Sequence, residues 1–200
     1  MPNAPATIPK KQMLIGATIG LILKHGYAGT TVDLICAEAG VTKGSFFHYF
    51  DSKEAIMYAA MDAWSAGWKG IVTDANFEGI SDPVERVFKL LDVMSAAYMD
   101  PRCDIGCVVG NIAQELSLSN GAMRKECERH FEMWLEVTVK LLTDAKLAQN
   151  ASFDPDGVGR FMIAMVQGSM LVAKTMDDRI ILAANVEHLR TYLNPLMKQY

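Results

Sequence analysis

Apolar residues recur at every third or fourth position through almost the whole chain, whereas the apolar–polar alternation typical of a β-strand is almost absent. Glycine, proline and cap-forming aspartate, serine and threonine residues separate the apolar runs. Hydrophobic residues make up 50% of the chain and charged residues 21%, which is an ordinary composition for a globular protein. The pattern therefore predicts an all-α fold of about nine helices without a sheet.

Cap residues and helix breakers predict where each helix begins and ends. Thr30 with Asp33 resembles a capping box for the second helix. Thr42 is the expected N-cap of the third helix, and Asp51 is that of the fourth. We expect helices over residues 10–25, 32–39, 42–50, 51–73, 83–99, 104–118, 121–148, 155–176 and 180–198.

The sequence argues against a membrane or secreted protein. No run reaches the ~18 uncharged apolar residues that a membrane-spanning helix needs. No small-residue cleavage site follows the apolar run 13–23, so a signal peptide is not expected. Four cysteines in a chain of this size do not resemble a disulfide framework. We therefore expect a cytoplasmic protein with reduced cysteines.

The N-terminal quarter differs in charge from the rest of the chain. Residues 1–50 carry four lysines and two acidic residues, a net charge of +2, whereas the whole chain carries −4. Within this quarter, the predicted helices over 32–39 and 42–50 are joined by a tight turn that contains Gly40. Two short helices joined in this way form a candidate helix-turn-helix, which would bind DNA through its second helix.

The second helix of this pair has residue types that suit a helix entering a DNA groove with its N-terminus first. Gly44 lets the backbone approach a sugar-phosphate strand closely, and the helix dipole favours phosphate at this end. Phe46 and Phe50 share one face and are expected in the core, and simple packing is the alternative interpretation of this aromatic-rich helix. The polar groups available to DNA come from Thr42, Lys43, Ser45, His48 and Tyr49.

One segment, from His25 to Ala60, closely resembles the DNA-binding domain of the TetR family of one-component transcriptional repressors; it reads HGYAGTTVDLICAEAGVTKGSFFHYFDSKEAIMYAA. The resemblance rests on a glycine-aromatic pair, two threonines, I-x-x-x-A-G-V and K-G-S-F-x-H-Y-F-x-S-K-E, all in one register. Segments 106–117 and 168–175 also look similar to family members, with lower specificity. Residues 1–9 contain three prolines and are expected to form a flexible arm. The resemblance implies a helix-turn-helix DNA-binding domain over 10–54 and a ligand-binding and dimerisation domain over 55–200.

The resemblance also implies which residues contact a double-stranded DNA operator. Phe47 stands where many family members have tyrosine, so we expect apolar contact with a thymine methyl group in place of a hydroxyl contact. Lys53 is expected to bind a phosphate, with simple solvation as the alternative. The implied DNA contacts are Thr31, Thr42, Lys43, Gly44, Ser45, Phe47, His48, Tyr49 and Lys53.

In the family, the C-terminal part binds an inducer and forms a homodimer through its last two helices. Here the helix over 155–176 has small residues, such as Gly159 and Gly168, that allow another helix to approach. The last helix carries an apolar stripe that serves the core, a partner or both: Leu182, Val186, Leu189, Leu193 and Leu196. We expect a homodimer that binds a palindromic operator.

Aromatic and methionine residues at helical spacing suggest a mostly apolar cavity for a small hydrophobic or aromatic inducer. The same spacing is also typical of an ordinary protein core. The candidate pocket residues are Trp64, Trp68, Phe88, Tyr98, Cys107, Asn111, Phe131, Trp134, Met162, Met165 and Met170.

Cys107 has several interpretations. A free cysteine is most often a small buried hydrophobic residue, whereas a thiol sensor of oxidants or electrophiles needs a nearby cation, for which Arg102 or Lys174 are candidates. An enzyme that pairs Cys107 with His130 is a further alternative, although no catalytic, phosphate-binding or cofactor motif accompanies the pair. Cys103, Cys107 and His130 also lack the spacing of a metal site.

The leading hypothesis is a homodimeric repressor that a small molecule releases from its operator, with the helix over 51–73 as the connection between the two functions. The alternatives are a repressor that senses oxidants or electrophiles through Cys107, a helical scaffold that does not bind DNA, and a thiol-dependent enzyme.

Overall fold

The computed structural model describes residues 8–74, 77–101 and 103–197. Over these residues the chain forms nine α-helices, one short 3₁₀ helix and no strand, which confirms the predicted all-α class. No helix in this part of the chain is long and apolar enough to span a membrane.

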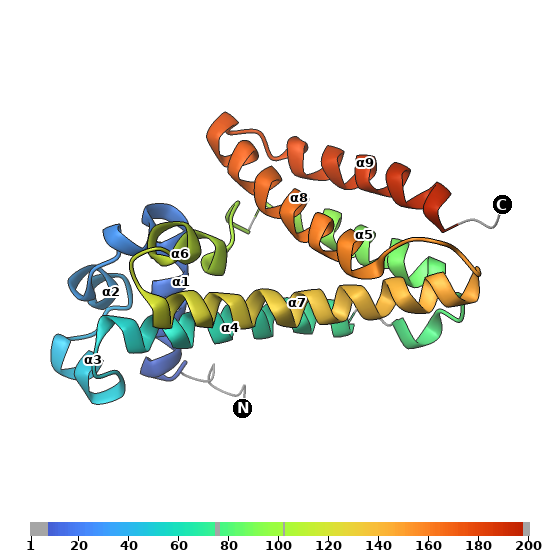
Figure 1. Cartoon of the computed structure of the whole chain (residues 1–200). Helices are drawn as coiled ribbons and strands as arrows, with labels where there is room; N and C mark the ends of the chain where they lie inside the picture. The colour runs from blue at the N-terminus through green and yellow to red at the C-terminus, as the bar shows by residue number, and fades with distance from the viewer. Residues whose placement is uncertain (1–7, 75–76, 102, 198–200) are drawn as a thin grey trace, which may run out of the picture.

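Figure 1 shows a small group of helices at one end of the molecule and a longer bundle at the other. The small group consists of α1 (Lys10–Gly29), α2 (Val32–Glu38) and α3 (Lys43–Tyr49). From it, α4 (Lys53–Asp74) runs into the longer bundle. The other elements are η1 (Phe77–Gly79), α5 (Pro83–Met99), α6 (Val108–Leu116), α7 (Gly121–Ala148), α8 (Pro155–Met176) and α9 (Ile180–Leu196).

Two hydrophobic cores hold these helices together. The first contains Leu14 of α1, Phe46 of α3 and Met57 of α4, and α6 completes it through Ile112, so a helix from the second half of the chain belongs to the N-terminal core. The second core lies between α5, α7, α8 and α9. Three helices therefore connect the small helix group to the longer bundle: α6, α4 and α7, whose Met123 and Cys127 also belong to the first core.

The helix caps agree only in part with the prediction. Thr42 caps α3 as predicted, because its hydroxyl accepts a hydrogen bond of 3.2 Å from the backbone N–H three residues later. Thr31, not Thr30, caps α2, since Thr30 is buried and its hydroxyl donates to the backbone carbonyl four residues earlier (2.6 Å). Ser52, not Asp51, accepts the capping hydrogen bond at the start of α4 (3.1 Å). Both wrong predictions miss the cap by one residue.

The predicted helix over 104–118 is shorter in the structure. Gly106 adopts a φ of 152°, a conformation that other residues rarely take, and α6 begins only at Val108. Cys107 is the N-cap of α6, with its Sγ accepting a hydrogen bond of 3.3 Å from the N–H of Gly110. Cys103 therefore lies outside the helix that Cys107 caps.

Candidate DNA interface and ligand pocket

Helix α3 is fixed to the first core by one face and presents the other to solvent. Phe46 is fully buried, and Phe50, directly after the helix, is also buried. Phe47 is a large apolar residue, yet 54% of its surface is exposed. Its ring meets that of Phe46 edge to face. The other predicted DNA contacts of this region lie on the surface or near it: Thr31, Thr42, Lys43, Gly44, His48 and Tyr49 are exposed, and Ser45 is half-buried.

Lys43 is paired with an acidic residue of the neighbouring helix. Its Nζ lies 2.6 Å from Oδ1 of Asp33 on α2, and both side chains are mostly exposed. The hydrogen bond to the Asp33 carboxylate raises the pKa of Lys43, so its ammonium is fully charged at neutral pH. A phosphate that binds Lys43 must therefore compete with Asp33.

Lys53 points toward α1. Its Nζ donates a hydrogen bond of 2.7 Å to the backbone carbonyl of Tyr27 and lies 3.9 Å from the centroid of the Tyr27 ring. Partial burial lowers the pKa of Lys53. The structure thus gives this predicted phosphate ligand an internal partner at the junction of α4 with α1.

A kink in α1 is the point where several helices meet. Gly26 has φ 72° and ψ −175°, so the helix does not end there as predicted but resumes and continues to Gly29. The carboxylate of Glu115 on α6 accepts hydrogen bonds from the N–H groups of Tyr27 (2.7 Å) and Ala28 (2.8 Å), which follow the kink. The kink thereby exposes backbone groups of α1 to side chains from the second half of the chain.

Two further side chains bind carbonyl groups of α1 just before the kink. The amide of Asn111, on α6, donates to the carbonyl of Ile22 (3.0 Å). The ammonium of Lys174, on α8, donates to the carbonyl of Leu23 (2.5 Å). Together with Glu115, they attach α6 and α8 to one short stretch of α1.

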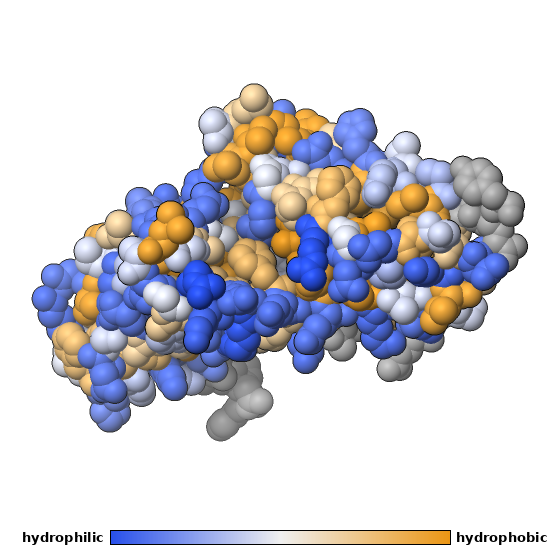
Figure 2. All heavy atoms as spheres, viewed as in Figure 1, coloured by the Kyte–Doolittle hydropathy of each residue, from blue (hydrophilic) through white to orange (hydrophobic). Residues whose placement is uncertain are grey.

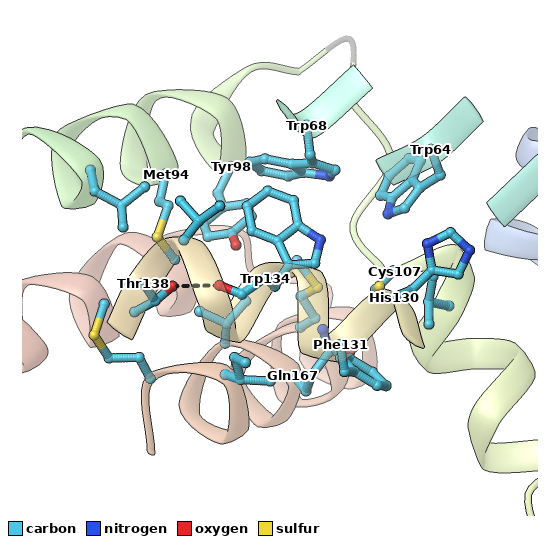
Figure 3. A pocket seen from close by; sticks show the side chains of 17 residues that line it. Trp64, Trp68, Met94, Tyr98, Cys107, His130, Phe131, Trp134, Thr138 and Gln167 are labelled. Atoms are coloured by element: carbon cyan, nitrogen blue, oxygen red, sulfur yellow. Dashed lines mark hydrogen bonds between the residues drawn. The ribbon is translucent and has the colours of Figure 1, made fainter. Parts of the chain in front are cut away.

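The main candidate for a ligand site is a cavity of about 80 Å³ between α4, α5, α7 and α8, closed at one end by the start of α6. Figure 3 shows the aromatic side chains that surround it. The lining residues are Trp64, Trp68, Leu90, Met94, Tyr98, Cys107, Val109, His130, Phe131, Trp134, Val137, Thr138, Met162, Ile163, Val166, Gln167 and Met170.

Eight of the eleven predicted pocket residues line this cavity, namely Trp64, Trp68, Tyr98, Cys107, Phe131, Trp134, Met162 and Met170. The structure places the other three elsewhere. Phe88 packs beneath the guanidinium of Arg190, at 5.4 Å. Asn111 bonds to α1 as described, and Met165 belongs to a surface groove between α8 and α9.

Sequence reasoning missed nine lining residues. The missing set includes His130, Val137 and Thr138, which stand three or four positions from Trp134 and therefore share its helix face. Gln167 has the same relation to Ile163 and Met170 on α8. Helical spacing around the predicted aromatic residues could have found them.

Trp68 is at the centre of the aromatic cluster. Its ring centroid lies 6.4 Å from that of Trp64, 5.5 Å from that of Tyr98 and 5.8 Å from that of Trp134. The pairs Trp64–Trp68 and Trp68–Trp134 meet edge to face, an arrangement that aromatic rings favour. The chain has three tryptophans, and all three line this pocket.

Among the described residues, no formally charged side chain lines the pocket. None of its lining residues is Asp, Glu, Lys or Arg. His130 is buried and its Nε2 lies 3.1 Å from the guanidinium of Arg129, which can only donate, so Nε2 accepts and the ring is neutral. Nδ1 then carries the proton and donates to the hydroxyl of Ser65 (2.7 Å). Burial and the charge of Arg129 both lower the pKa of His130, in agreement with this tautomer.

Cys107 faces the pocket as a neutral thiol. Burial raises the pKa of the Cys107 thiol, and the hydrogen bond from the N–H of Gly110 opposes this effect only in part. Of the two cations considered from the sequence, Lys174 binds the carbonyl of Leu23, and Arg102 lies outside the described residues.

Among the described residues, the group with metal-ligating geometry is Asp62, Glu126 and His130, whose donor atoms lie within 4.8 Å of one another. Arg129 already occupies this cluster, since its guanidinium binds the carboxylates of Asp62 (2.7 Å) and Glu126. The cluster is therefore an ion-paired network, and the structure does not bring Cys103 and Cys107 into it.

The last two helices leave an apolar surface uncovered. Most of the predicted stripe of α9, such as Leu182 and Leu193, is buried against its own chain and serves the second core. Figure 2 shows hydrophobic residues gathered where α8 and α9 join. The exposed large apolar residues of these helices are Phe161, Leu171, Val172, Met176, Ile180 and Tyr192.

The structure has an exposed helix-turn-helix on one core, and α4 and α6 join it to a helical bundle with an apolar pocket. These features define a one-component DNA-binding transcriptional regulator. Family comparison agrees with this class. Residues 14–60 match the family described as bacterial regulatory proteins of the tetR family, and residues 83–189 match the tetracyclin repressor-like C-terminal domain. The chain belongs to the TetR family.

Individual relatives extend over most of the chain. The transcriptional repressor DhaR of Mycobacterium sp. (strain GP1) is 30% identical over 176 residues, which cover 87% of each protein. A regulator from the lacX 3′ region of Lactococcus lactis subsp. lactis is 29% identical, over 90% of this chain and 91% of its own. A TetR regulator from Chloroflexus aurantiacus has a similar fold, with a TM-score of 0.81 at 24% identity over 92% of this chain and 94% of its own.

Proposed function

We propose that this regulator is a repressor that binds a palindromic operator as a homodimer and that a small molecule in the aromatic pocket releases it from DNA. It acts in the cytoplasm, without catalytic activity of its own. The observation that carries the proposal is the position of α6: its N-cap, Cys107, lines the pocket, and its Glu115 is bonded to the kink of α1.

Ligand binding reaches the DNA-binding helices through two connections. In the first, a ligand that displaces Cys107 or Gln167 moves α6 and hence the carboxylate of Glu115 on α1. In the second, Trp64 and Trp68 place α4 in the pocket wall, while Lys53 at the other end of α4 bonds to Tyr27. The ligand needs only to prefer the arrangement in which α3 no longer fits the operator.

The proposed dimer forms through α8 and α9. Both helices expose several large apolar side chains, and monomeric proteins rarely leave large apolar patches open to solvent. A two-fold dimer brings two copies of α3 to successive half-sites of a palindrome. The repressor sense is supported by the relative DhaR, which is named as a transcriptional repressor.

The proposed DNA contacts are the nine residues predicted from the sequence. Residues of the α3 N-terminus bind base edges and the adjoining backbone, and Phe47 meets a thymine methyl group. Thr31 and Tyr49, both exposed, bind phosphates. Lys53 contributes only if it leaves the Tyr27 carbonyl.

The experiment is a titration of the protein onto DNA from immediately upstream of its own gene, followed by fluorescence anisotropy at several salt concentrations. We expect tight, sequence-selective binding of two protomers per site with a steep dependence on salt. Weak binding that is equal for unrelated DNA would contradict the proposal. Release of bound DNA is then screened with small uncharged compounds, using the same signal.

A thiol-sensing repressor is the second candidate, because Cys107 lines the pocket and a reactive compound bound there would meet its sulfur. The raised pKa of Cys107 argues for slow reaction, since the thiolate is the nucleophile. If a Cys107→Ser variant still releases DNA normally when treated with an electrophile, this candidate is wrong.

A further inference from the structure

The Tyr98 hydroxyl is a polar group of the pocket that makes no hydrogen bond to a described residue. Tyr98 is only 8% exposed, and burial raises its pKa so strongly that it stays protonated. Within the described residues its hydroxyl makes no hydrogen bond to the protein. No fully buried polar side-chain atom among them lacks a partner, so this hydroxyl reaches the open space of the cavity. Figure 3 shows it beside the ring of Trp134.

The other polar groups of the pocket are mostly satisfied by the protein. Thr138 donates to the carbonyl of Trp134 (2.9 Å), and both nitrogens of His130 are bonded. The Gln167 carbonyl oxygen is the exception: it packs against Gly110, where a Cβ would lie 2.3 Å from it, and accepts no hydrogen bond from a described residue. The indole N–H groups of Trp68 and Trp134 make no hydrogen bond to any described residue, and an indole N–H can only donate.

We infer that the pocket binds a small uncharged ring compound with one oxygen acceptor, such as a ketone, and that the Tyr98 hydroxyl donates to this oxygen. This inference rests on the proposed function only in assuming that the pocket is a ligand site. The hydroxyl of Tyr98 and the indole N–H groups are donors, so they select a ligand with an acceptor, and no carboxylate among the described lining residues can pair with a cation. Because none of the described residues that line the pocket is Lys or Arg, an anion would lose its hydration there without gaining a counter-charge from them.

The volume limits the size of the ligand. A cavity of about 80 Å³ has room for roughly five to eight non-hydrogen atoms, if each takes the space of one water, and a larger ligand would have to extend into the adjoining cavity of about 410 Å³ that shares Trp64, Trp68 and Tyr98 with it. Edge-to-face packing covers part of the faces of Trp68 and Trp134, so these rings do not form an open cage for a quaternary ammonium group. A six-membered ring with one carbonyl group fits both limits.

The test is calorimetric titration of the full-length protein with four compounds of similar size: cyclohexanone, methylcyclohexane, cyclohexylammonium and cyclopentanecarboxylate. Tryptophan emission provides a second signal, because all three tryptophans line the pocket. We expect cyclohexanone to bind most tightly and the two ions at least ~100-fold more weakly, since their charges would be buried without partners.

Tyr98→Phe removes the hydroxyl with little change in volume. It should weaken cyclohexanone binding about threefold to tenfold, the range for one neutral hydrogen bond, and leave methylcyclohexane within a factor of about two. Tyr58→Phe, outside the pocket on α4, is the matched control and should change neither.

Equal binding of cyclohexanone and methylcyclohexane overturns the inference, as does tighter binding of either ion or no binding of any compound. Operator release is measured separately by anisotropy. Binding of cyclohexanone without release of the operator supports the inferred chemistry and contradicts the proposed function. Release by cyclopentanecarboxylate alone supports the proposed function and contradicts the inferred chemistry.

Discussion

The carboxylate of Glu115 on α6 accepts a hydrogen bond of 2.7 Å from the backbone N–H of Tyr27, directly after the kink of α1. Tyr27 is also bonded to α4, since its hydroxyl donates to Glu54 (3.0 Å) and its carbonyl accepts from Lys53 (2.7 Å). One residue of α1 thus contacts both helices that lead to the pocket. The contact between Tyr27 and Glu115 is therefore where pocket and DNA-binding helices are most directly joined.

Glu115→Ala should lower the free energy of unfolding by about 1–3 kcal/mol, because two N–H groups at the kink lose a charged acceptor. It should also reduce the ligand-induced change in operator affinity, which is measured by anisotropy with and without ligand. Glu132→Ala, an exposed glutamate on α7, is the control for urea unfolding. Equal stability of the two variants would show that the Glu115 contact contributes nothing.

Neighbouring phenylalanines of α3 should respond in opposite ways. Phe46 is fully buried, so Phe46→Ala should cost about 3–5 kcal/mol of unfolding free energy. Phe47 is mostly exposed, so Phe47→Ala should change stability by only about 0.5 kcal/mol and instead lower operator affinity. Thermal unfolding and anisotropy on the same samples separate the two effects. Unchanged operator affinity of Phe47→Ala would remove this residue from the DNA contacts.

The pair Lys43–Asp33 predicts a variant that binds DNA more tightly than the parent. Asp33→Asn removes the carboxylate that holds Lys43 at 2.6 Å and deletes one negative charge beside the proposed DNA surface. Operator affinity should rise several-fold, whereas Lys43→Ala should lower it and reduce the slope of log K against log salt by about 0.9. The slopes come from anisotropy titrations at four or more salt concentrations. An unchanged slope in Lys43→Ala would mean that Lys43 binds no phosphate.

His130 predicts how stability depends on pH. Its pKa is lowered in the folded chain by burial and by Arg129, with Asp62 and Glu126 opposing, whereas the unfolded chain has the ordinary value of about 6.5. Below pH ~6.5 the unfolded chain binds a proton that the folded chain does not, so the free energy of unfolding falls as the pH falls, by at most about 1.4 kcal/mol per pH unit. This contribution is complete above about pH 6.5.

Urea unfolding at several pH values between 5 and 7.5 measures this dependence. His130→Asn removes the titrating group and should flatten the slope in this range, whatever its effect on absolute stability. His48→Asn, at the exposed face of α3, should leave the slope as it is in the parent. A parent-like slope in His130→Asn would show that another group titrates.

The sequence predicts the fold better than the site because helix signals are local. Residue periodicity and Pro, Gly and Asp positions predict α8 to the residue, from Pro155 to Met176. The cap of α2 is missed because Thr30 is drawn into the core and bonds to the end of α1, a contact that only the folded chain defines. Local signals therefore fix the elements but not the contacts between them.

The pocket shows the same limit. The size and spacing of aromatic residues such as Trp134 predict that they line the pocket. Asn111 is predicted to line it too, but its amide instead bonds to the carbonyl of Ile22, 89 residues earlier in the chain. The neutrality of the site depends on Arg129, which is outside the pocket and sets the tautomer of His130. Such relations depend on tertiary packing, which one-dimensional patterns do not encode.

The apolar surface of α8 and α9 predicts how the molecule associates. Leu171 is 56% exposed, so Leu171→Glu should fold normally but place a charge in the proposed interface, where it would be buried without a partner. We expect self-association to weaken at least ~100-fold, and operator affinity to fall because a monomer binds one half-site. Leu147→Glu, at the end of α7, where the leucine is 73% exposed, should leave both unchanged. Sedimentation equilibrium measures the association, and a Leu171→Glu protein that remains dimeric would place the interface elsewhere.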